Sequence, residues 1–153
     1  IMHDLRHVLE RVTTLAEVNT TASRAWAREF DEHRRIGLGQ FLTRDELAKR
    51  ESQRLGDIMS MMRGAKLMRS GQTASYLATS RPRSMRGECF AHVWLDGMPM
   101  YLGRPGEPLY NINELLVMQI EAIEYYEGPA ETPAKYNNLN ANCGVLVVHT
   151  KRD

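Results

Sequence analysis

Two stretches near the end of the chain carry its clearest patterns of apolar and polar positions. Residues 120–127, IEAIEYYE, alternate as a half-buried strand does, and Gly128-Pro129 ends that pattern because proline cannot donate to a strand ladder. Residues 145–148 are apolar at consecutive positions, which predicts a strand covered on both faces. We expect these two strands to close the core at the centre of a small sheet.

A β-hairpin is predicted over residues 91–103, AHVWLDGMPMYLG. Asp96 and Gly97 form a favoured two-residue turn because both tolerate positive φ. Along the first strand, Val93 and Leu95 should share one face of the sheet, and the residues between them should point the other way.

Short helices are predicted between the remaining strands. Thr43 and Glu46 form a capping box at the start of residues 43–51. A second helix follows over residues 54–64, with an apolar stripe along one face and Gly64 as its stop. Residues 65–69 then have the pattern of a short strand. A third short helix is expected over residues 111–119, where Asn111 and Glu114 can form the cap.

The first part of the chain has a weaker pattern. Residues 1–23 combine helical spacing with β-leaning composition, which favours an extended arm or an edge strand. Residues 23–35 are more clearly helical, with Trp26 and Phe30 four residues apart on one face. Two glycines then break the helix. We therefore expect an N-terminal arm and helix over residues 1–40 and a domain over residues 41–153.

Residues 69–88 are rich in Gly, Ser and Thr, which predicts a loop. The loop contains four arginines, and Glu88 is the only acidic residue that offsets their charge. The arginines are Arg69, Arg81, Arg83 and Arg86. This basic loop is predicted to contact a partner or an anionic lipid surface, the alternative being a solvated loop without a partner. Trp26 and Phe30 are predicted as further contacts, because an arm with few apolar residues should lie on another surface.

Composition and charge set the class of protein. The chain has 153 residues, enough for one domain with a core, and 42% hydrophobic and 25% charged residues are ordinary globular values. Residues 1–88 carry 16 Lys+Arg and 11 Asp+Glu, a net charge of +5, whereas residues 89–153 carry 4 and 8, a net charge of −4. This asymmetry suits docking between charged surfaces, although two solvated faces would also explain it.

The same composition argues against two classes of protein. No apolar run approaches the roughly 20 residues of a membrane span, so the chain is predicted to lie peripheral to a membrane without a segment that crosses it. The arginines are not interleaved with aromatic residues, which argues against nucleic-acid binding. The first residue is isoleucine and no leader peptide is visible, which leaves open whether a leader was removed or the start is missing.

The two cysteines each precede a strand pattern, Cys89 before residues 91–97 and Cys143 before residues 144–150. Two buried thiols are one option. A pair at matching strand starts is better explained by a disulfide, provided that the compartment is oxidising.

Candidate catalytic and metal-binding patterns are weak. The five histidines form no ligand pair, and the nine methionines are better explained as flexible core residues than as a soft-metal site. Four glutamates gather around the Gly128-Pro129 turn, which could suggest a divalent cation, but alternating solvent-facing carboxylates are the default. No base, nucleophile and oxyanion site assemble, so we predict neither catalysis, nor a metal, nor a cofactor.

The order of these elements resembles the plug domain of TonB-dependent outer-membrane receptors. The match covers roughly residues 41–152. Its strongest part is Ile-Glu-x-(aliphatic or aromatic)-x-Gly-Pro, matched from Ile123 to Pro129. The other matching runs, in chain order, are FLTRDEL, LGDIMSMMRGAKL, VWLDGMPMY and NCGVLVVHTK.

The sequence departs from the family pattern at several places. Arg63 stands where the family usually has proline, and KYNNLNANCG replaces its usual Tyr- and Gly-rich segment. The N-terminal energy-coupling box is not evident in residues 1–20. In the receptors a barrel of many strands follows the plug, whereas the given sequence ends at Asp153, which leaves open a shortened chain or an orphan plug-like domain.

The resemblance implies an α+β fold, with a small mixed sheet of about four or five strands and short helices packed on it. It also implies a non-catalytic domain of the bacterial cell envelope. We expect an accessory subunit that docks on a larger membrane protein complex from the periplasmic side. The alternative is the gating plug of a TonB-dependent transporter, which would bind a small ligand.

Overall fold

The computed structural model describes residues 24–79, 88–137 and 141–152. The chain divides into two compact units, residues 1–36 and residues 37–151. In the first unit, residues 24–36 are helical, and the rings of Trp26 and Phe30 meet edge to face with centroids 6.4 Å apart.

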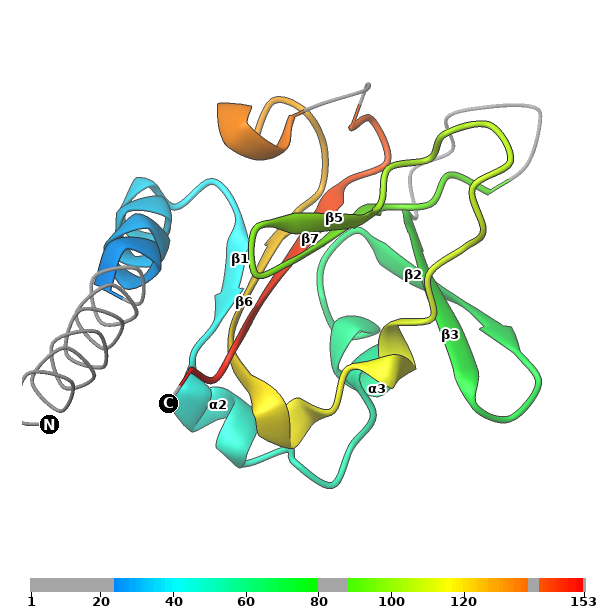
Figure 1. The fold of residues 1–153 in the computed structure, drawn as a ribbon, viewed down its shortest axis with the longest axis horizontal. Helices are drawn as coiled ribbons and strands as arrows, with labels where there is room; N and C mark the ends of the chain where they lie inside the picture. Colours follow the sequence, from blue (N-terminus) through cyan, green and yellow to red (C-terminus); the bar gives the residue numbers. More distant parts are fainter. Residues whose placement is uncertain (1–23, 80–87, 138–140, 153) are drawn as a thin grey trace, which may run out of the picture. The chain divides into compact units, whose positions relative to one another are not determined.

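Most of the second unit is built on a five-stranded mixed sheet. Its central strand, β7 (Val145–Thr150), pairs antiparallel with β6 (Ile120–Tyr126) and parallel with β4 (His92–Leu95). Figure 1 shows β7, in red, running beside β6. The edge strands are β1 (Gln40–Leu42), beside β6, and β5 (Met98–Tyr101), beside β4.

A two-stranded antiparallel sheet and several short helices complete the unit. The sheet contains β2 (Ala65–Ser70) and β3 (Ala74–Thr79). The helices are α2 (Arg44–Ala48), α3 (Leu55–Met59) and the 3-10 turns η1 (Ile112–Glu114), η2 (Val117–Gln119) and η3 (Ala134–Tyr136). The predicted α+β class with a small mixed sheet is confirmed.

Two local predictions need correction. The loop predicted over residues 69–88 contains strand β3, whose Leu77 and Ala78 are buried. Its Ser- and Thr-containing sequence is typical of loops, but the strand is stabilised by packing against α3 and η1. The helix predicted over residues 111–119 is instead two separate 3-10 turns.

The sheet has a separate apolar core on each face. Alternate residues of β6 and β7, such as Ile123 and Val148, pack with Leu47 of α2 and Ile58 of α3 in the first core. The residues between them, such as Val147, join Trp94, Tyr126 and Tyr136 in the second core, on the opposite face. Because β7 contributes to both, its apolar positions follow each other without alternation, as the sequence predicted.

A network of side-chain amides joins α3, β3 and η1. The side chain of Asn111 accepts hydrogen bonds from the backbone N–H groups of Ser75 and Asn113 at 3.0 and 3.1 Å. The Asn113 amide accepts from the Gly56 N–H at 2.8 Å and donates to the hydroxyl of Ser75. A Cβ atom at Gly56 would lie 2.7 Å from that hydroxyl oxygen, so α3 can approach only because residue 56 is glycine.

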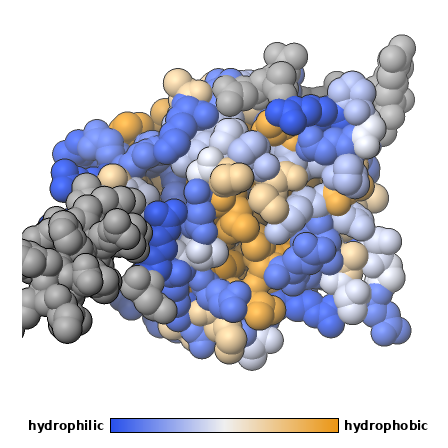
Figure 2. Space-filling model, viewed as in Figure 1, coloured by the Kyte–Doolittle hydropathy of each residue, from blue (hydrophilic) through white to orange (hydrophobic). Residues whose placement is uncertain are grey.

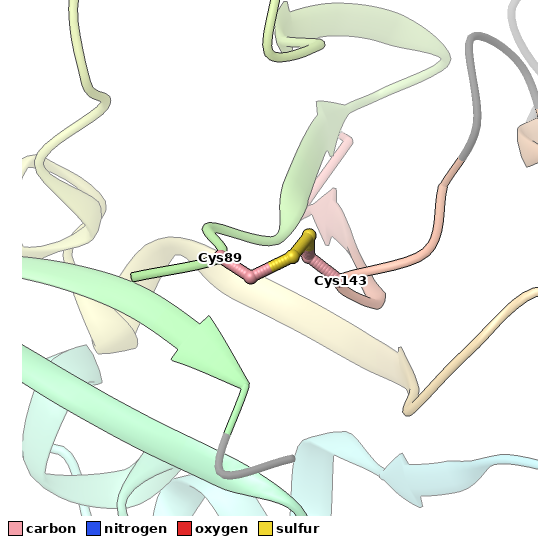
Figure 3. Close-up of a disulfide and its surroundings, with 2 residues drawn as sticks. All are labelled: Cys89 and Cys143. Carbon is pink, nitrogen blue, oxygen red and sulfur yellow. A yellow bond between two sulfur atoms is a disulfide. The ribbon is translucent and has the colours of Figure 1, made fainter. Parts of the chain in front are cut away.

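A disulfide joins Cys89 to Cys143, with their Cα atoms 5.3 Å apart (Figure 3). Each cysteine precedes one of the two parallel strands, β4 and β7, and the N–H of His92 donates to the carbonyl of Gly144 beside it. The predicted disulfide is therefore present. It ties the start of the central strand, β7, to the start of the neighbouring strand, β4.

Within residues 24–79, 88–137 and 141–152, no helix combines the length and apolar character needed to cross a bilayer.

Replacing both cysteines by serine should lower the free energy of unfolding by about 4 kcal/mol, because the bridge closes a long loop in the unfolded chain. The sequence separation of 54 residues sets that loop. Urea unfolding of the oxidised protein, the reduced protein and the double variant measures the effect. The reduced protein should match the variant, and equal stability in all three states would contradict a role for the bridge.

Candidate functional site

A group of polar side chains lies buried on the second face of the sheet. The Glu124 carboxylate on β6 accepts a hydrogen bond from the Tyr126 hydroxyl at 2.5 Å. Its other oxygen lies 2.6 Å from Nε2 of His149 on β7. The side chains of Glu124 and His149 are only 1% and 7% exposed.

The neighbouring strands explain why these three residues meet. Glu124 and Tyr126 are two residues apart on β6 and so point to the same face. His149 pairs with Ala122 across the β6–β7 ladder, on that same face. A buried carboxylate is costly unless hydrogen-bond donors surround it, and the tyrosine and histidine supply them. Because both members of the pair are enclosed, the arrangement serves the packing of the sheet and offers no surface for a substrate.

The glutamates around the Gly128-Pro129 turn do not converge. Glu124 points into the sheet, contrary to the solvent-facing position predicted for this group. Glu127 lies 3.4 Å from the amide of Gln40, and its backbone N–H donates to Glu131. Within residues 24–79, 88–137 and 141–152, no three His, Cys, Asp or Glu side chains lie close enough to hold a metal.

Gly128-Pro129 begins a compact turn after β6. The Gly128 carbonyl accepts from the Thr132 hydroxyl at 2.7 Å, and the Pro129 carbonyl accepts from the Asn137 amide at 3.2 Å. The turn then brings Tyr136 against Trp94, with ring centroids 5.3 Å apart. Through this contact the segment after β6 covers the second core.

The Asp96-Gly97 turn lies between β4 and β5, and both residues have positive φ, 49° and 82°. The Asp96 carboxylate also accepts from the N–H of Thr150 at 2.8 Å and from its hydroxyl. The turn therefore holds the end of β7 in addition to reversing the chain. No local pattern in the sequence indicates this long-range contact.

The residues predicted to contact a partner lie in three places. Arg69 is exposed on β2 and forms an ion pair with Asp57 at 3.2 Å. Trp26 and Phe30 lie on the helix of the first unit, where Phe30 is buried. Arg81, Arg83 and Arg86 are outside the described residues. For all six residues, the role as a partner contact stays a prediction.

Exposed apolar side chains are a surface feature that the sequence reasoning missed. Figure 2 shows an apolar band across one face, bordered by hydrophilic residues. Among the exposed apolar side chains, Met98 on β5 is 65% exposed, Leu116 just before η2 is 52% exposed, and Met118 within η2 is 55% exposed. The prediction that the methionines are core residues holds for Met59, which is buried, but not for Met98, Met100 and Met118. The sequence signal for the exposed pair is Pro99 between Met98 and Met100, because proline in a strand favours a sheet edge.

His92 is a buried base on β4 that the sequence reasoning did not single out. Its side chain faces the second core, and Nδ1 is buried without a hydrogen-bond partner among the described residues. Burial lowers the pKa of His92, and the charge of Glu107 opposes this shift more weakly. The neutral imidazole is therefore the form that the fold favours.

Comparisons with known proteins place the fold. No protein-family model matches the chain, and no curated protein matches it. Among solved structures, a double-mutant form of the ferric enterobactin receptor PfeA from Pseudomonas aeruginosa matches with a TM-score of 0.54 and 22% identity over 80% of this chain. The chain has a plug-like fold. This confirms the resemblance to the plug domains of TonB-dependent receptors at the level of fold.

Two further solved structures match the chain with lower TM-scores. A second PfeA mutant, in complex with enterobactin, has a TM-score of 0.50 and 24% identity over 74% of the chain. The ferric yersiniabactin uptake receptor FyuA from Yersinia pestis has a TM-score of 0.47 and 16% identity over 74%. The chain spans only 17–18% of the length of these receptors.

Replacing His149 with leucine should lower the free energy of unfolding by about 3 kcal/mol, because the buried Glu124 carboxylate loses its charged or hydrogen-bonding partner. Replacing both Glu124 and His149 with leucine should cost less than the single change, since no unpaired carboxylate remains. A double-mutant cycle measured by urea unfolding tests this coupling. Additive effects of the two changes would show that the pair is not coupled.

The stability of the domain should fall as the pH drops below about 6.5, the ordinary pKa of histidine. The folded state holds His92 with a lowered pKa, so the unfolded state binds a proton first and is favoured in acid. The measurement is the urea midpoint between pH 7.5 and 5. A His92→Phe variant should show a smaller decrease than the wild type, whereas an identical pH dependence would refute the assignment.

Proposed function

We propose that this chain is a non-catalytic, plug-like module of the bacterial cell envelope. It acts as an accessory subunit that docks on a larger membrane protein complex from the periplasmic side. The single observation that supports this most is the plug-like fold, found in receptors of which the module makes up less than a fifth of the length.

The surface of the domain supports docking. Its exposed methionine and leucine side chains are flexible and apolar, which suits contact with another protein. Arg69 adds a positive charge on β2, with 65% of its side chain exposed. An apolar patch next to charged residues is the usual composition of an interface with a polar rim.

The disulfide supports an extracytoplasmic location. Disulfides persist in compartments such as the periplasm and are rare where cellular thiols keep cysteines reduced. The bridge between Cys89 and Cys143 therefore fits a protein that functions on the periplasmic side of the envelope.

Purification of the tagged native protein from solubilised envelopes tests the proposal. The expected result is recovery with a multi-subunit membrane complex, identified by mass spectrometry of cross-linked species. A reduced sample with the same tag controls for folding. Recovery only as a free monomer after cross-linking would refute docking.

The second candidate is the gating plug of a TonB-dependent transporter that binds a small ligand. It is favoured by the described function of the matching structure PfeA, which is a ferric enterobactin receptor. Finding the module inside, or covalently continuous with, an outer-membrane receptor in the same purification would select this candidate over the accessory subunit.

Reversing the charge of Arg69 should reduce the amount of co-purified partner at least about 5-fold, as expected for losing an attractive contact at an interface. Lys49→Glu is the matched control, because Lys49 is also exposed but follows α2, away from β2. Both variants should remain folded, and Arg69→Glu should lose at most about 1 kcal/mol of stability, because the ion pair with Asp57 that it removes is exposed. Equal partner recovery with Arg69→Glu and Lys49→Glu would remove Arg69 from the interface.

A further inference from the structure

Strand β2 leaves one edge of the two-stranded sheet open. Its register with β3 runs unbroken over six residue pairs, from Ala65–Thr79 to Ser70–Ala74, and β3 is its only neighbour in the sheet (Figure 1). Among the residues that the structure describes, the backbone of Lys66 to Ser70 has no hydrogen bond outside that ladder. Alternate N–H and C=O groups of β2 therefore point away from β3 and are available to a further strand.

The other sheet edges in the described part of this unit are less suited to accept a strand. β1 has three residues. β5 has four, contains Pro99, which has no N–H to donate, and shows a register shift against β4. The outer edge of β3 already meets Phe90 through a bridge at Ala78. β2, by contrast, has six residues without proline, glycine or a bulge, so it lacks most of the features that protect sheet edges.

The lysine on β2 does not protect the open edge, although an edge lysine usually discourages pairing. Lys66 pairs with Ala78 of β3, and Ala78 in turn bridges Phe90. Glu88 is two residues before Phe90, so it lies on the far side of β3 as seen from β2. The Nζ atom of Lys66 is 2.8 Å from the Glu88 carboxylate. The lysine side chain therefore extends over β3, away from the open edge.

The charge around β2 favours an acidic partner. Residues 54–79 carry four Lys+Arg and one Asp, a net charge of +3. Two copies of β2 paired antiparallel about their middle would set Lys66 of one copy opposite Arg69 of the other. Like charges directly opposite each other destabilise a sheet, which argues against a second copy of this chain as the added strand.

The two faces of β2 indicate which side chains the added strand needs. Leu67 is partly buried against the first core, and Met68, on the opposite face, is half-buried. Lys66 and Arg69, on either side of this apolar pair, have side chains that are 49% and 65% exposed. A complementary strand has two apolar residues flanked by acidic residues.

We propose that the outer edge of β2 accepts an extended acidic segment of a partner protein as an additional strand. Backbone hydrogen bonds supply the affinity in this mode of binding, and alternate side chains supply the specificity. The inference rests on the proposed docking role, for which it names the surface that is used and the kind of segment that is bound. Arg69 contributes charge to this surface, and the backbone of β2 contributes the hydrogen bonds.

The experiment is a two-dimensional NMR titration of the full oxidised chain with the peptide acetyl-Thr-Glu-Val-Ile-Glu-Thr-amide. Its glutamates match Lys66 and Arg69, and its apolar pair matches the two residues between them. The expected dissociation constant is on the order of 1 mM, as for a short peptide that adds one strand. The amide resonances of β2 should shift, and its outward-facing amides should exchange with solvent more slowly in the presence of the peptide.

Two control peptides separate the backbone from the side chains. One has the same sequence with N-methyl groups on its four central residues, which removes their backbone donors. The other has lysine in place of both glutamates, which reverses the charge. Each should bind at least about 5-fold more weakly than the acidic peptide, because the first loses hydrogen bonds and the second is repelled.

Proline variants test the backbone of β2 itself. Consecutive N–H groups of an antiparallel strand point alternately toward its partner and away from it. Of Leu67→Pro and Met68→Pro, one therefore removes an outward donor and the other breaks the ladder with β3. The variant that urea unfolding shows to be folded is the outward one, and it should bind the acidic peptide at least about 5-fold more weakly.

A charge exchange decides the outcome even if neither proline variant folds. Arg69→Glu should weaken binding of the acidic peptide and strengthen binding of the lysine peptide. The inference is overturned if the acidic peptide leaves the β2 amides unshifted, if the N-methylated peptide binds equally well, or if Arg69→Glu does not change the preference between the two charged peptides.

Recovery of the native partner separates this inference from the docking role. If the wild type and the folded proline variant recover the same amount of partner from solubilised envelopes, the β2 edge is excluded and the docking role stands. If the acidic peptide binds β2 but no partner is recovered with the wild type, the docking role falls and the strand-accepting edge stands.

Discussion

The enclosure of strand β7 on all sides is the constraint on which the rest of the structure depends. Its backbone is paired on one edge with β6 and on the other with β4, so its N–H and C=O groups are satisfied inside the sheet. Its side chains enter both cores, and Val145 to Val148 have no exposed surface. A strand in this position needs apolar residues at consecutive positions, which is what the sequence provides.

Several contacts hold this central strand at its two ends. The disulfide fixes its entry next to the entry of β4, and the Asp96 carboxylate holds Thr150 at its exit. Near that exit, His149 is joined to Glu124 of β6. The strand is therefore fixed by a covalent bond, a turn and a buried polar pair, and the surface of the domain is left available for contacts with other molecules.

The sequence predicted the parts of the fold that local chemistry determines. The Asp96-Gly97 hairpin, the Thr43 cap and the unalternating β7 each follow from residues close together in the chain. Prediction from the sequence failed where packing between distant parts of the chain determines the structure. The sequence of strand β3 predicts a loop because its Ser and Thr residues are common in loops. The sequence predicts a solvent-facing Glu124 because the partner of this residue, His149, lies 25 residues away along the chain.

Native-state hydrogen exchange of the backbone amides tests the central position of β7 most directly, because the slowest amides report the most stable part of a fold. The account predicts that the amides of β7 and of the facing positions of β6 exchange most slowly, through global unfolding. It also predicts that the amides of β2, at the edge of the second sheet, exchange faster. If the amides of β7 exchanged as fast as those of β2, the strand could not be the enclosed centre described here.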